Sequence, residues 1–211
     1  MTDTNTHTRR TPADAWREMV RGNERFVAGT PAHPRQNVER REELAGYQEP
    51  HVALFGCSDS RLAAEIIFDK GLGDLFVVRN AGHVITDSAI ASLEYPVALL
   101  DVPLIVVLAH DTCGAVRAAI DLDAPDTPPL PPHIAGLVAG IRPAVRASEP
   151  RDAETVGITH LRRTVTELVA RSELISDAVA EGRLAVVGAN YKLLEGVVVP
   201  AIVIGDVGTE A

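Results

Sequence analysis

Two short stretches of the sequence combine side chains that bind metal ions or move protons. "CSDSR" contains Cys57, Asp59 and Arg61, and "HDTC" contains His110 and Cys113. Thiolate, imidazole and carboxylate groups are the ligands that zinc accepts, commonly in a tetrahedral arrangement. Two thiolates and one imidazole leave a fourth position open, which is typical of a catalytic zinc site. Asp59 is a candidate to fill that position or to stand beside it.

The same residues have more ordinary interpretations. A lone cysteine at the end of a strand is usually a small buried hydrophobic residue, and a lone H-x-x-C is weak evidence of a metal site. Cys57 and Cys113 are the only two cysteines of the chain, and they do not form a C-x-x-C motif. The absence of that motif weighs against a redox pair. Unconnected core thiols and a redox pair remain the alternatives to zinc at this point.

Four apolar segments predict the strands that would bring these residues together. They are rich in β-branched residues, continuous rather than alternating, and separated by helical patterns, which indicates parallel strands buried on both faces. Cys57 ends the first strand and His110 ends the third, so both are expected at the rim where ligands bind in such sheets. A helix opening after His110 would set Cys113 on the same helix face. The predicted strands are residues 51–57, 74–80, 103–110 and 183–191.

The predicted fold class is α/β, with a mostly parallel central sheet of four strands plus an edge strand, flanked by helices, and an N-terminal helical arm. The edge strand is expected within residues 196–206, antiparallel, where Pro200 is tolerable. Residues 1–11 are interpreted as a flexible N-terminal arm and 12–211 as a single domain, with a proline-rich surface excursion at 123–133. Helices are predicted from Asp14 to near Gly29, at 62–71, 87–101 and 114–122, and over about 134–181.

Composition narrows the classes of function. The chain has 211 residues, 46% hydrophobic and 23% charged, which suits one globular domain. Its formal net charge of −9 argues against a general binder of nucleic acids or anionic membranes. No apolar run reaches the roughly 18–20 residues of a membrane span, and the N-terminus lacks an apolar signal segment. With two cysteines, we expect a cytoplasmic protein whose thiols are free or metal-bound.

The stretches "CSDSR", "FVVRNAGHV" and "HDTCG", in this order and at matching intervals, resemble the β-class carbonic anhydrases, and actinobacterial members in particular. The resemblance covers roughly residues 14–205. It implies one zinc ion per subunit, held by Cys57, His110 and Cys113. The implied reaction is reversible hydration of carbon dioxide to bicarbonate and a proton by zinc-hydroxide attack. It also implies a catalytic dyad in which Arg61 holds Asp59 off the metal, although in some members Asp59 ligates zinc instead.

The resemblance further implies a set of substrate-binding residues. Gln48 matches a glutamine that donates to an oxygen of carbon dioxide or bicarbonate, while Phe76, Ala81 and Tyr95 match residues that line an apolar pocket. Gly114 would permit a tight approach beside Cys113. In the family this pocket lies at a dimer interface, with the glutamine and aromatic side chains supplied by the partner subunit. We therefore expect a homo-oligomer, either a dimer or a tetramer, with the active site at the subunit interface and small anions as candidate inhibitors.

One departure from the family pattern and two alternative functions complete the sequence-based hypotheses. His83 stands where many members have asparagine, so it is either a proton shuttle or an ordinary loop histidine. Gly82, next to it, would keep the backbone close to the site. One alternative function is hydrolysis of another small heteroallene such as carbon disulfide, although no tunnel-forming extension is evident. The other is a non-catalytic, zinc-stabilised binding protein, against which Asp59, Arg61 and Gln48 weigh.

Overall fold

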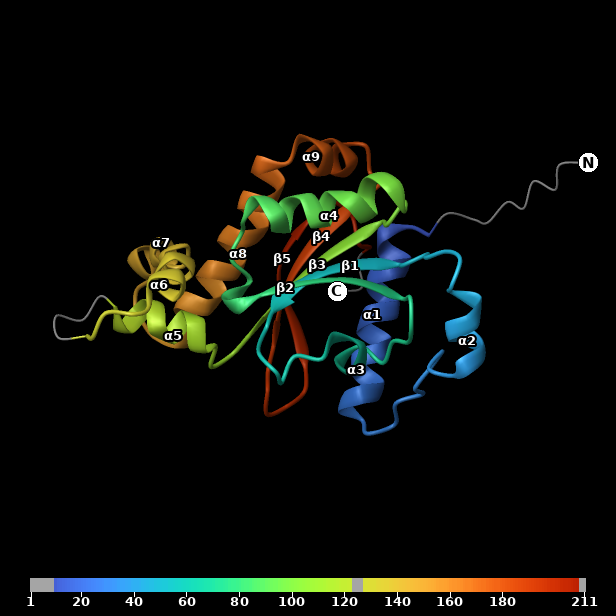
Figure 1. The fold of residues 1–211 in the computed structure, drawn as a ribbon, viewed down its shortest axis with the longest axis horizontal. Coiled ribbons are helices and arrows are strands. Elements are labelled where there is room, and N and C mark those ends of the chain that lie inside the picture. Colours follow the sequence, from blue (N-terminus) through green and yellow to red (C-terminus); the bar gives the residue numbers. More distant parts are fainter. Residues whose placement is uncertain (1–9, 123–126, 209–211) are drawn as a thin grey trace, which may run out of the picture.

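The centre of the fold is a five-stranded sheet in the computed structural model, which describes residues 10–122 and 127–208. The strand order is β2-β1-β3-β4-β5. β1 to β4 pair in parallel, and β5 runs antiparallel to β4 at one edge (Figure 1). This arrangement confirms the predicted fold class. The strands are β1 (Val52–Cys57), β2 (Leu75–Asn80), β3 (Leu104–His110), β4 (Ala185–Tyr191) and β5 (Val198–Ile204).

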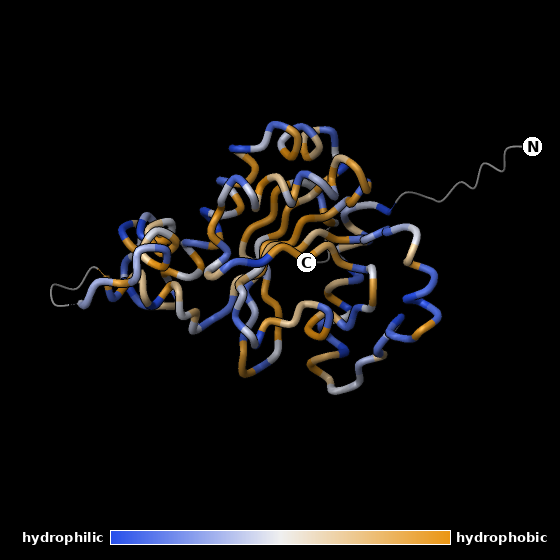
Figure 2. Tube along the Cα trace, in the orientation of Figure 1, coloured by the Kyte–Doolittle hydropathy of each residue, from blue (hydrophilic) through white to orange (hydrophobic). Residues whose placement is uncertain are grey.

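Helices cover both faces of the sheet because successive strand side chains point to opposite faces. Phe55 and Ile105 belong to the core on one face, whereas their neighbours Leu54 and Val106 belong to the core on the other. The strands form the apolar centre of the molecule in Figure 2. One face is covered by α4 (Asp87–Leu99), α8 (Ala153–Arg171) and α9 (Glu173–Ala180), and the other by α1 (Pro12–Val27) and α3 (Ala64–Ile67).

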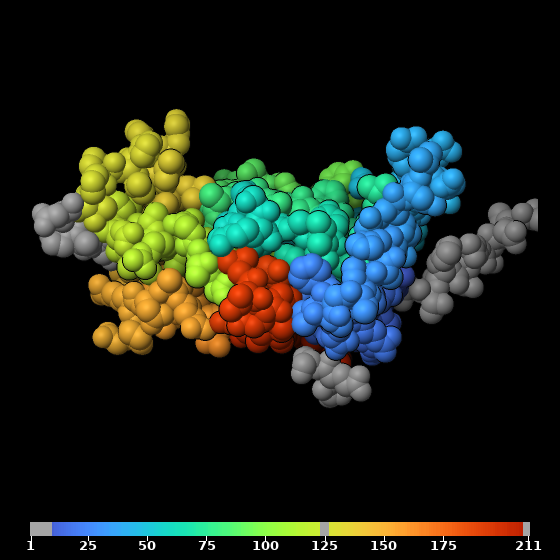
Figure 3. All heavy atoms as spheres, turned by 90° about the horizontal axis from the view of Figure 1, so that it is seen from below, coloured from blue at the N-terminus to red at the C-terminus, as the bar shows by residue number. Residues whose placement is uncertain are grey.

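The segment between α1 and β1 is anchored by two buried carboxylates that follow α3. Asp69 accepts hydrogen bonds from Arg25 Nε at 2.6 Å and from the amides of Ala32 and His33 at 2.9 Å. Asp74 accepts from Arg35 Nε at 2.8 Å and Nη2 at 2.6 Å. These contacts fix the start of a segment that contains α2 (Val38–Glu43) and leads on to the loop of residue 48. Figure 3 shows this segment projecting from the body at one end.

The helices differ from the sequence-based expectation in three places. The stretch 134–181 is divided into α6 (Pro132–Ala139), α7 (Arg142–Ala147), α8 and α9. Pro143 and Pro150 cannot continue a helix that precedes them, and Ser172 caps the start of α9. The stretch 62–71 contains only the short α3. The helix predicted at 114–122 is confirmed as α5 (Gly114–Asp121), but the expectation that it opens early enough to hold His110 and Cys113 on one face is wrong, because Cys113 precedes it and Thr112 has a left-handed φ of 50°.

Some expectations fall partly outside the described residues. The predicted flexible arm includes residues 1–9 and the proline-rich excursion includes 123–126, neither of which the structure describes. Thr11 caps α1: its hydroxyl accepts from the Asp14 amide at 3.1 Å, and the Asp14 side chain bonds back to Thr11. In the described part of the chain, no helix is both long and apolar enough to cross a membrane.

Candidate metal centre

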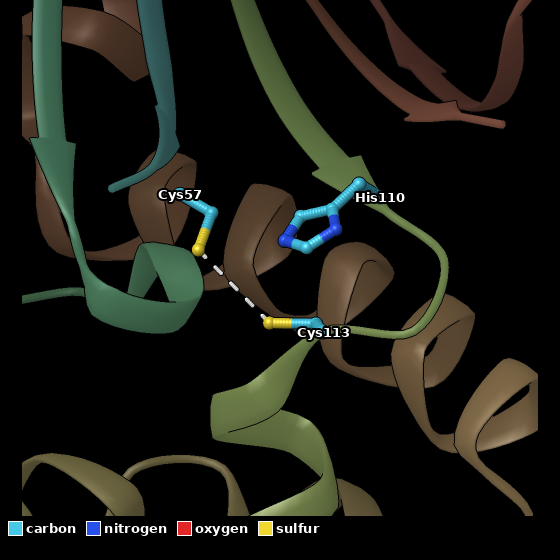
Figure 4. A group of neighbouring side chains, drawn as sticks. All are labelled: Cys57, His110 and Cys113. Carbon is cyan, nitrogen blue, oxygen red and sulfur yellow. Dashed lines mark hydrogen bonds between the residues drawn. The ribbon is translucent and has the colours of Figure 1, made fainter. Parts of the chain in front are cut away.

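The ends of two strands and the start of one helix bring Cys57, His110 and Cys113 together. Cys57 ends β1, His110 ends the neighbouring strand β3, and Cys113 is the residue before α5 (Figure 4). One ligand atom from each residue lies within 4.8 Å of the others, and all three residues are buried. The two Sγ atoms are 4.0 Å apart. Tetrahedral zinc with Zn–S bonds of about 2.3 Å separates its sulfur ligands by about 3.8 Å, so the spacing fits the metal.

The hydrogen bonds of His110 leave the correct nitrogen free for a metal ion. Its Nδ1 lies 2.8 Å from the carbonyl oxygen of Asp111. A carbonyl can only accept, so Nδ1 carries the proton and Nε2 presents a lone pair. Nε2 is buried and has no hydrogen-bond partner among the described residues. A buried nitrogen without a partner is costly, whereas one that faces two thiols is a ready ligand for zinc. The donor set therefore fits the ion.

Two backbone amides face the sulfur of Cys57. The amide of Asp59 lies 3.4 Å from this Sγ and the amide of Gly82 lies 3.3 Å from it. The hydrogen bond with the Cys113 thiol lowers the pKa of Cys57, with the two amides acting in the same direction, and the same thiol pairing raises the pKa of Cys113. Without metal, this pair loses one proton readily and the second only with difficulty. A cation between the two sulfurs would favour loss of both.

Asp59 and Arg61 form a two-point ion pair next to the metal group. Arg61 Nε donates to Oδ1 of Asp59 at 2.9 Å and Nη2 donates to Oδ2 at 2.7 Å, with the Arg61 amide adding a bond at 3.0 Å. These bonds to Arg61 hold the pKa of the Asp59 carboxyl well below its usual range. Oδ2 lies 3.8 Å from His110 Nε2. The carboxylate thus lies beside the metal group, and Arg61 balances its charge.

Gln48, Phe76 and Tyr95 are brought together elsewhere on the chain. They line an open groove of about 620 Å³ at the β2 edge of the sheet. The rings of Phe76 and Tyr95 stack at 5.9 Å between centroids. Among the described residues, the lining of this groove does not include Cys57 or the other members of the metal group; it comprises Gln48, Phe76, Val77, Val78, Ala91, Ser92 and Tyr95.

The two glycines that were predicted to allow close approach, Gly82 and Gly114, differ in how crowded their surroundings are. Gly82 has a left-handed φ of 74°, and a Cβ there would lie 2.8 Å from the Ala115 Cβ, so a glycine is needed at this position beside Cys57. A Cβ at Gly114 would meet nothing within 4 Å. The expectation that Gly114 permits a tight approach is therefore wrong within the chain. Ala81 begins the short 3-10 helix η1 (Ala81–His83) that contains Gly82.

His83 is neither an exposed loop histidine nor well suited to carry protons. It is fully buried, and burial lowers its pKa well below the usual value. Both ring nitrogens lack a hydrogen-bond partner among the described residues, and its ring lies 4.6 Å from that of His160. A proton shuttle must exchange protons with solvent, so this burial argues against that role.

Two residues beside the site were not singled out from the sequence. Arg79 donates from Nε to the Cys57 carbonyl at 2.9 Å and from Nη2 to the Asp59 carbonyl at 2.6 Å. Its place in "VVRNAG", one residue before the end of β2, is the signal that could have indicated it. His160 lies 2.8 Å from the Gly82 carbonyl oxygen. No local pattern distinguishes His160 from any other helical histidine.

Comparison with known proteins agrees with this geometry. The family model for carbonic anhydrase matches residues 52–198. A protein of Mycobacterium tuberculosis named carbonic anhydrase 2 is 48% identical over 202 residues, covering 94% of this chain and 97% of the relative. The chain belongs to the β-class carbonic anhydrases. This family consists of zinc enzymes, so the ion that the Cys57, His110 and Cys113 group fits is also the family's cofactor.

Other β-class carbonic anhydrases extend the comparison. The carbonic anhydrase of Mycolicibacterium smegmatis is 44% identical over 201 residues, covering 93% of this chain and 97% of the relative. Among solved structures, tetrameric β-carbonic anhydrase from Sordaria macrospora superposes with a TM-score of 0.69 at 24% identity, covering 89% of this chain and 96% of the other. The Coccomyxa enzyme in complex with acetazolamide superposes with a TM-score of 0.68 at 23% identity, covering 86% and 83%. At these identities the two structures support the fold alone.

Proposed function

We propose that this chain catalyses the zinc-dependent, reversible hydration of carbon dioxide to bicarbonate and a proton. The observation that carries the proposal is the Cys57, His110 and Cys113 group with the Asp59–Arg61 pair beside it. A structural zinc site needs four protein ligands and no ion pair beside it, whereas this one has three ligands and an acceptor held nearby. The names of the relatives support the same reaction.

Cys57, His110 and Cys113 are the residues that would hold the ion. When bound, zinc supplies the positive charge that makes water acidic enough to be a nucleophile near neutral pH. Two thiolates neutralise the formal charge of the ion, so this site is a weaker Lewis acid than one built from three neutral imidazoles. The Asp111 carbonyl keeps Nε2 of His110 directed at the ion by fixing the proton on Nδ1.

Asp59 would orient the nucleophile. As an ionised carboxylate it can only accept hydrogen bonds, so a water or hydroxide beside it must donate to it and turn a lone pair toward the carbon of the substrate. Arg61 has two effects on Asp59. It keeps the carboxylate ionised, and its two hydrogen bonds fix the plane of both oxygens. Asp59 and Arg61 are thus proposed as the catalytic residues.

The substrate would be bound by an apolar pocket that two subunits complete. Gln48, Phe76 and Tyr95 share one groove, yet that groove does not contain the metal group of the same chain. We propose a homo-oligomer in which the groove of one subunit faces the metal group of its partner, with Ala81 and Gly114 at the rim. The Sordaria macrospora enzymes are tetrameric, which supports an oligomer. Small anions would compete for the open position of the metal, and the two cysteines, which form no disulfide, support a cytoplasmic location.

Stopped-flow measurement of carbon dioxide hydration tests the reaction. We expect zinc-loaded protein to be active at pH 8–9, metal-stripped protein to be inactive, and Asp59→Asn to keep its zinc while losing rate. Asn has the shape of Asp but can donate, so it is the matched control for the orienting carboxylate. Absence of zinc-dependent hydration would overturn the proposal, and activity on carbon disulfide alone would instead support the heteroallene alternative.

Mixing two inactive variants tests the shared site. Cys57→Ala keeps the groove but loses the metal, whereas a Gln48→Ala/Tyr95→Ala double variant keeps the metal group but loses the groove. If the groove serves the partner, mixed dimers regain one complete site, and random mixing restores about a quarter of the wild-type sites. If each chain used its own groove, the mixture would stay inactive and the interface proposal would be wrong.

A further inference from the structure

The turn of residues 80–84 contacts Cys57 of the metal group through its backbone. The amide of Gly82 lies 3.3 Å from Cys57 Sγ, so the position of this peptide decides whether the sulfur receives a hydrogen bond. Gly82 has φ of 74° and His83 has φ of 41°, two left-handed residues in succession. Such a conformation is unfavourable for a non-glycine residue and persists only where the surroundings hold it. The turn therefore needs support from outside.

Part of that support is local. The side-chain amide of Asn80 donates to the Val84 carbonyl at 2.8 Å and accepts from the Val84 amide at 2.8 Å, which closes the two ends of the turn. These bonds do not reach the middle of the turn. The carbonyl of Gly82 belongs to the peptide between the two left-handed residues, and it therefore needs a donor from another element.

His160 reaches that carbonyl from α8. Its Nε2 lies 2.8 Å from the Gly82 oxygen although the two residues are 78 positions apart. Because a carbonyl only accepts, Nε2 must carry the proton, which defines the neutral tautomer of a side chain that is 4% exposed. The His160 ring also lies 4.6 Å from the ring of His83. One side chain thus contacts both left-handed residues of the turn.

We propose that His160 is a positioning residue for the metal centre, holding the Gly82 carbonyl so that the Gly82 amide donates to the thiolate of Cys57. The inference rests on the proposed function in so far as the metal is that of the carbonic anhydrase site. An N–H donor draws charge from a thiolate ligand, which strengthens the metal as a Lewis acid. Loss of the donor leaves more charge on Cys57, in a site where two thiolates already offset the charge of the ion.

Two amide replacements at position 160 separate hydrogen bonding from packing. In His160→Gln the side-chain nitrogen can occupy the place of Nε2 and still donate to Gly82. In His160→Asn the nitrogen falls at the place of Nδ1 and cannot reach the carbonyl. Val165→Ala, a buried change on the same helix, controls for general loss of stability. The readouts are zinc affinity by chelator competition and the thiolate-to-cobalt charge-transfer band of cobalt-substituted protein.

We expect His160→Asn to bind zinc about 10–100-fold more weakly, as is usual when a group supporting a ligand is removed. Its cobalt band should move to longer wavelength, while His160→Gln and Val165→Ala stay close to wild type. Equal shifts of the cobalt band in His160→Asn, His160→Gln and Val165→Ala, or no shift in any of them, would overturn the inference. If His160→Asn fails to fold, ¹⁵N spectra of the wild-type protein still test the inference, because a proton on Nδ1 of His160 rather than on Nε2 would contradict it.

These measurements are independent of turnover. A protein whose cobalt band responds to position 160 but which does not hydrate carbon dioxide would retain this inference and lose the proposed function. A protein that hydrates carbon dioxide but whose cobalt band is unchanged by substitution at position 160 would retain the proposed function and lose this inference.

Discussion

Replacing Gly82 by alanine is expected to lower the free energy of unfolding by about 3 kcal/mol. With φ at 74°, an added side chain costs roughly 1–2 kcal/mol in the left-handed region. The new Cβ would lie 2.8 Å from the Cβ of Ala115 and 2.9 Å from Cδ1 of Ile141. Ile141 can rotate away, but the Ala115 methyl cannot, and overpacking of this kind costs about 1–3 kcal/mol.

Two other glycines separate these contributions. Gly29 has φ of 68° but nothing within 4 Å of an added Cβ, so Gly29→Ala should show the conformational cost alone, about 1–2 kcal/mol. Gly114 has neither a left-handed φ nor a close neighbour. Gly114→Ala should therefore stabilise the fold slightly, by about 0.4–1 kcal/mol, because alanine restricts the unfolded chain.

Urea unfolding followed by circular dichroism provides the measurement, at one protein concentration and with zinc either saturating or removed by chelator. Because the Gly82 amide donates to Cys57 Sγ, the loss in Gly82→Ala should be larger with zinc than without it. If Gly82→Ala costs no more than Gly29→Ala in the metal-free protein, the contacts with Ala115 and Ile141 do not restrict this position. The packing argument would then be refuted.

Three further outcomes are expected. His110→Ala should remove zinc and activity together, as measured by metal analysis and stopped-flow, and retention of stoichiometric zinc would contradict its role as a ligand. Arg61→Gln should lose more activity near neutral pH than at high pH, since Asp59 is then free to approach the metal; a uniform loss would count against this. Burial lowers the pKa of His83 and of His160, so below about pH 6.5 the unfolded chain binds protons that the folded one does not. The free energy of unfolding of the metal-free protein, measured in urea, should therefore fall as the pH is lowered below this value, and it should fall less steeply in His83→Leu. Equal slopes in the two proteins would refute this.

Much of the metal group was predictable because its parts depend on local pattern. The continuous apolar runs before Cys57 and His110 predict parallel strands, and parallel strands end at one rim, which places both residues together. The contact between Asp59 and Arg61, which the family resemblance implied, spans only two positions of one loop. The antiparallel edge strand with Pro200 was predictable for the same kind of reason, since proline is tolerated at a sheet edge.

Other features depend on contacts that no local pattern records. "HDTC" has the spacing of one helical turn, yet Thr112 takes a left-handed φ and α5 starts only at Gly114. His83 looked like a loop histidine, but packing against Phe55 and His160 buries it completely. The groove of Gln48 combines a loop, a strand and a helix that are distant in sequence.

The sequence by itself determined the fold class, the family and the three residues that can hold zinc, because strand periodicity and closely spaced motifs carry that information. The tertiary structure alone decided how those residues are supported. His160 reaches Gly82 across 78 positions, and Gly82 in turn reaches Cys57. The first contact depends on the packing of α8 and the second on the pairing of β1 with β2, which brings Cys57 opposite Asn80. Packing between distant elements is set by the whole core rather than by any one segment.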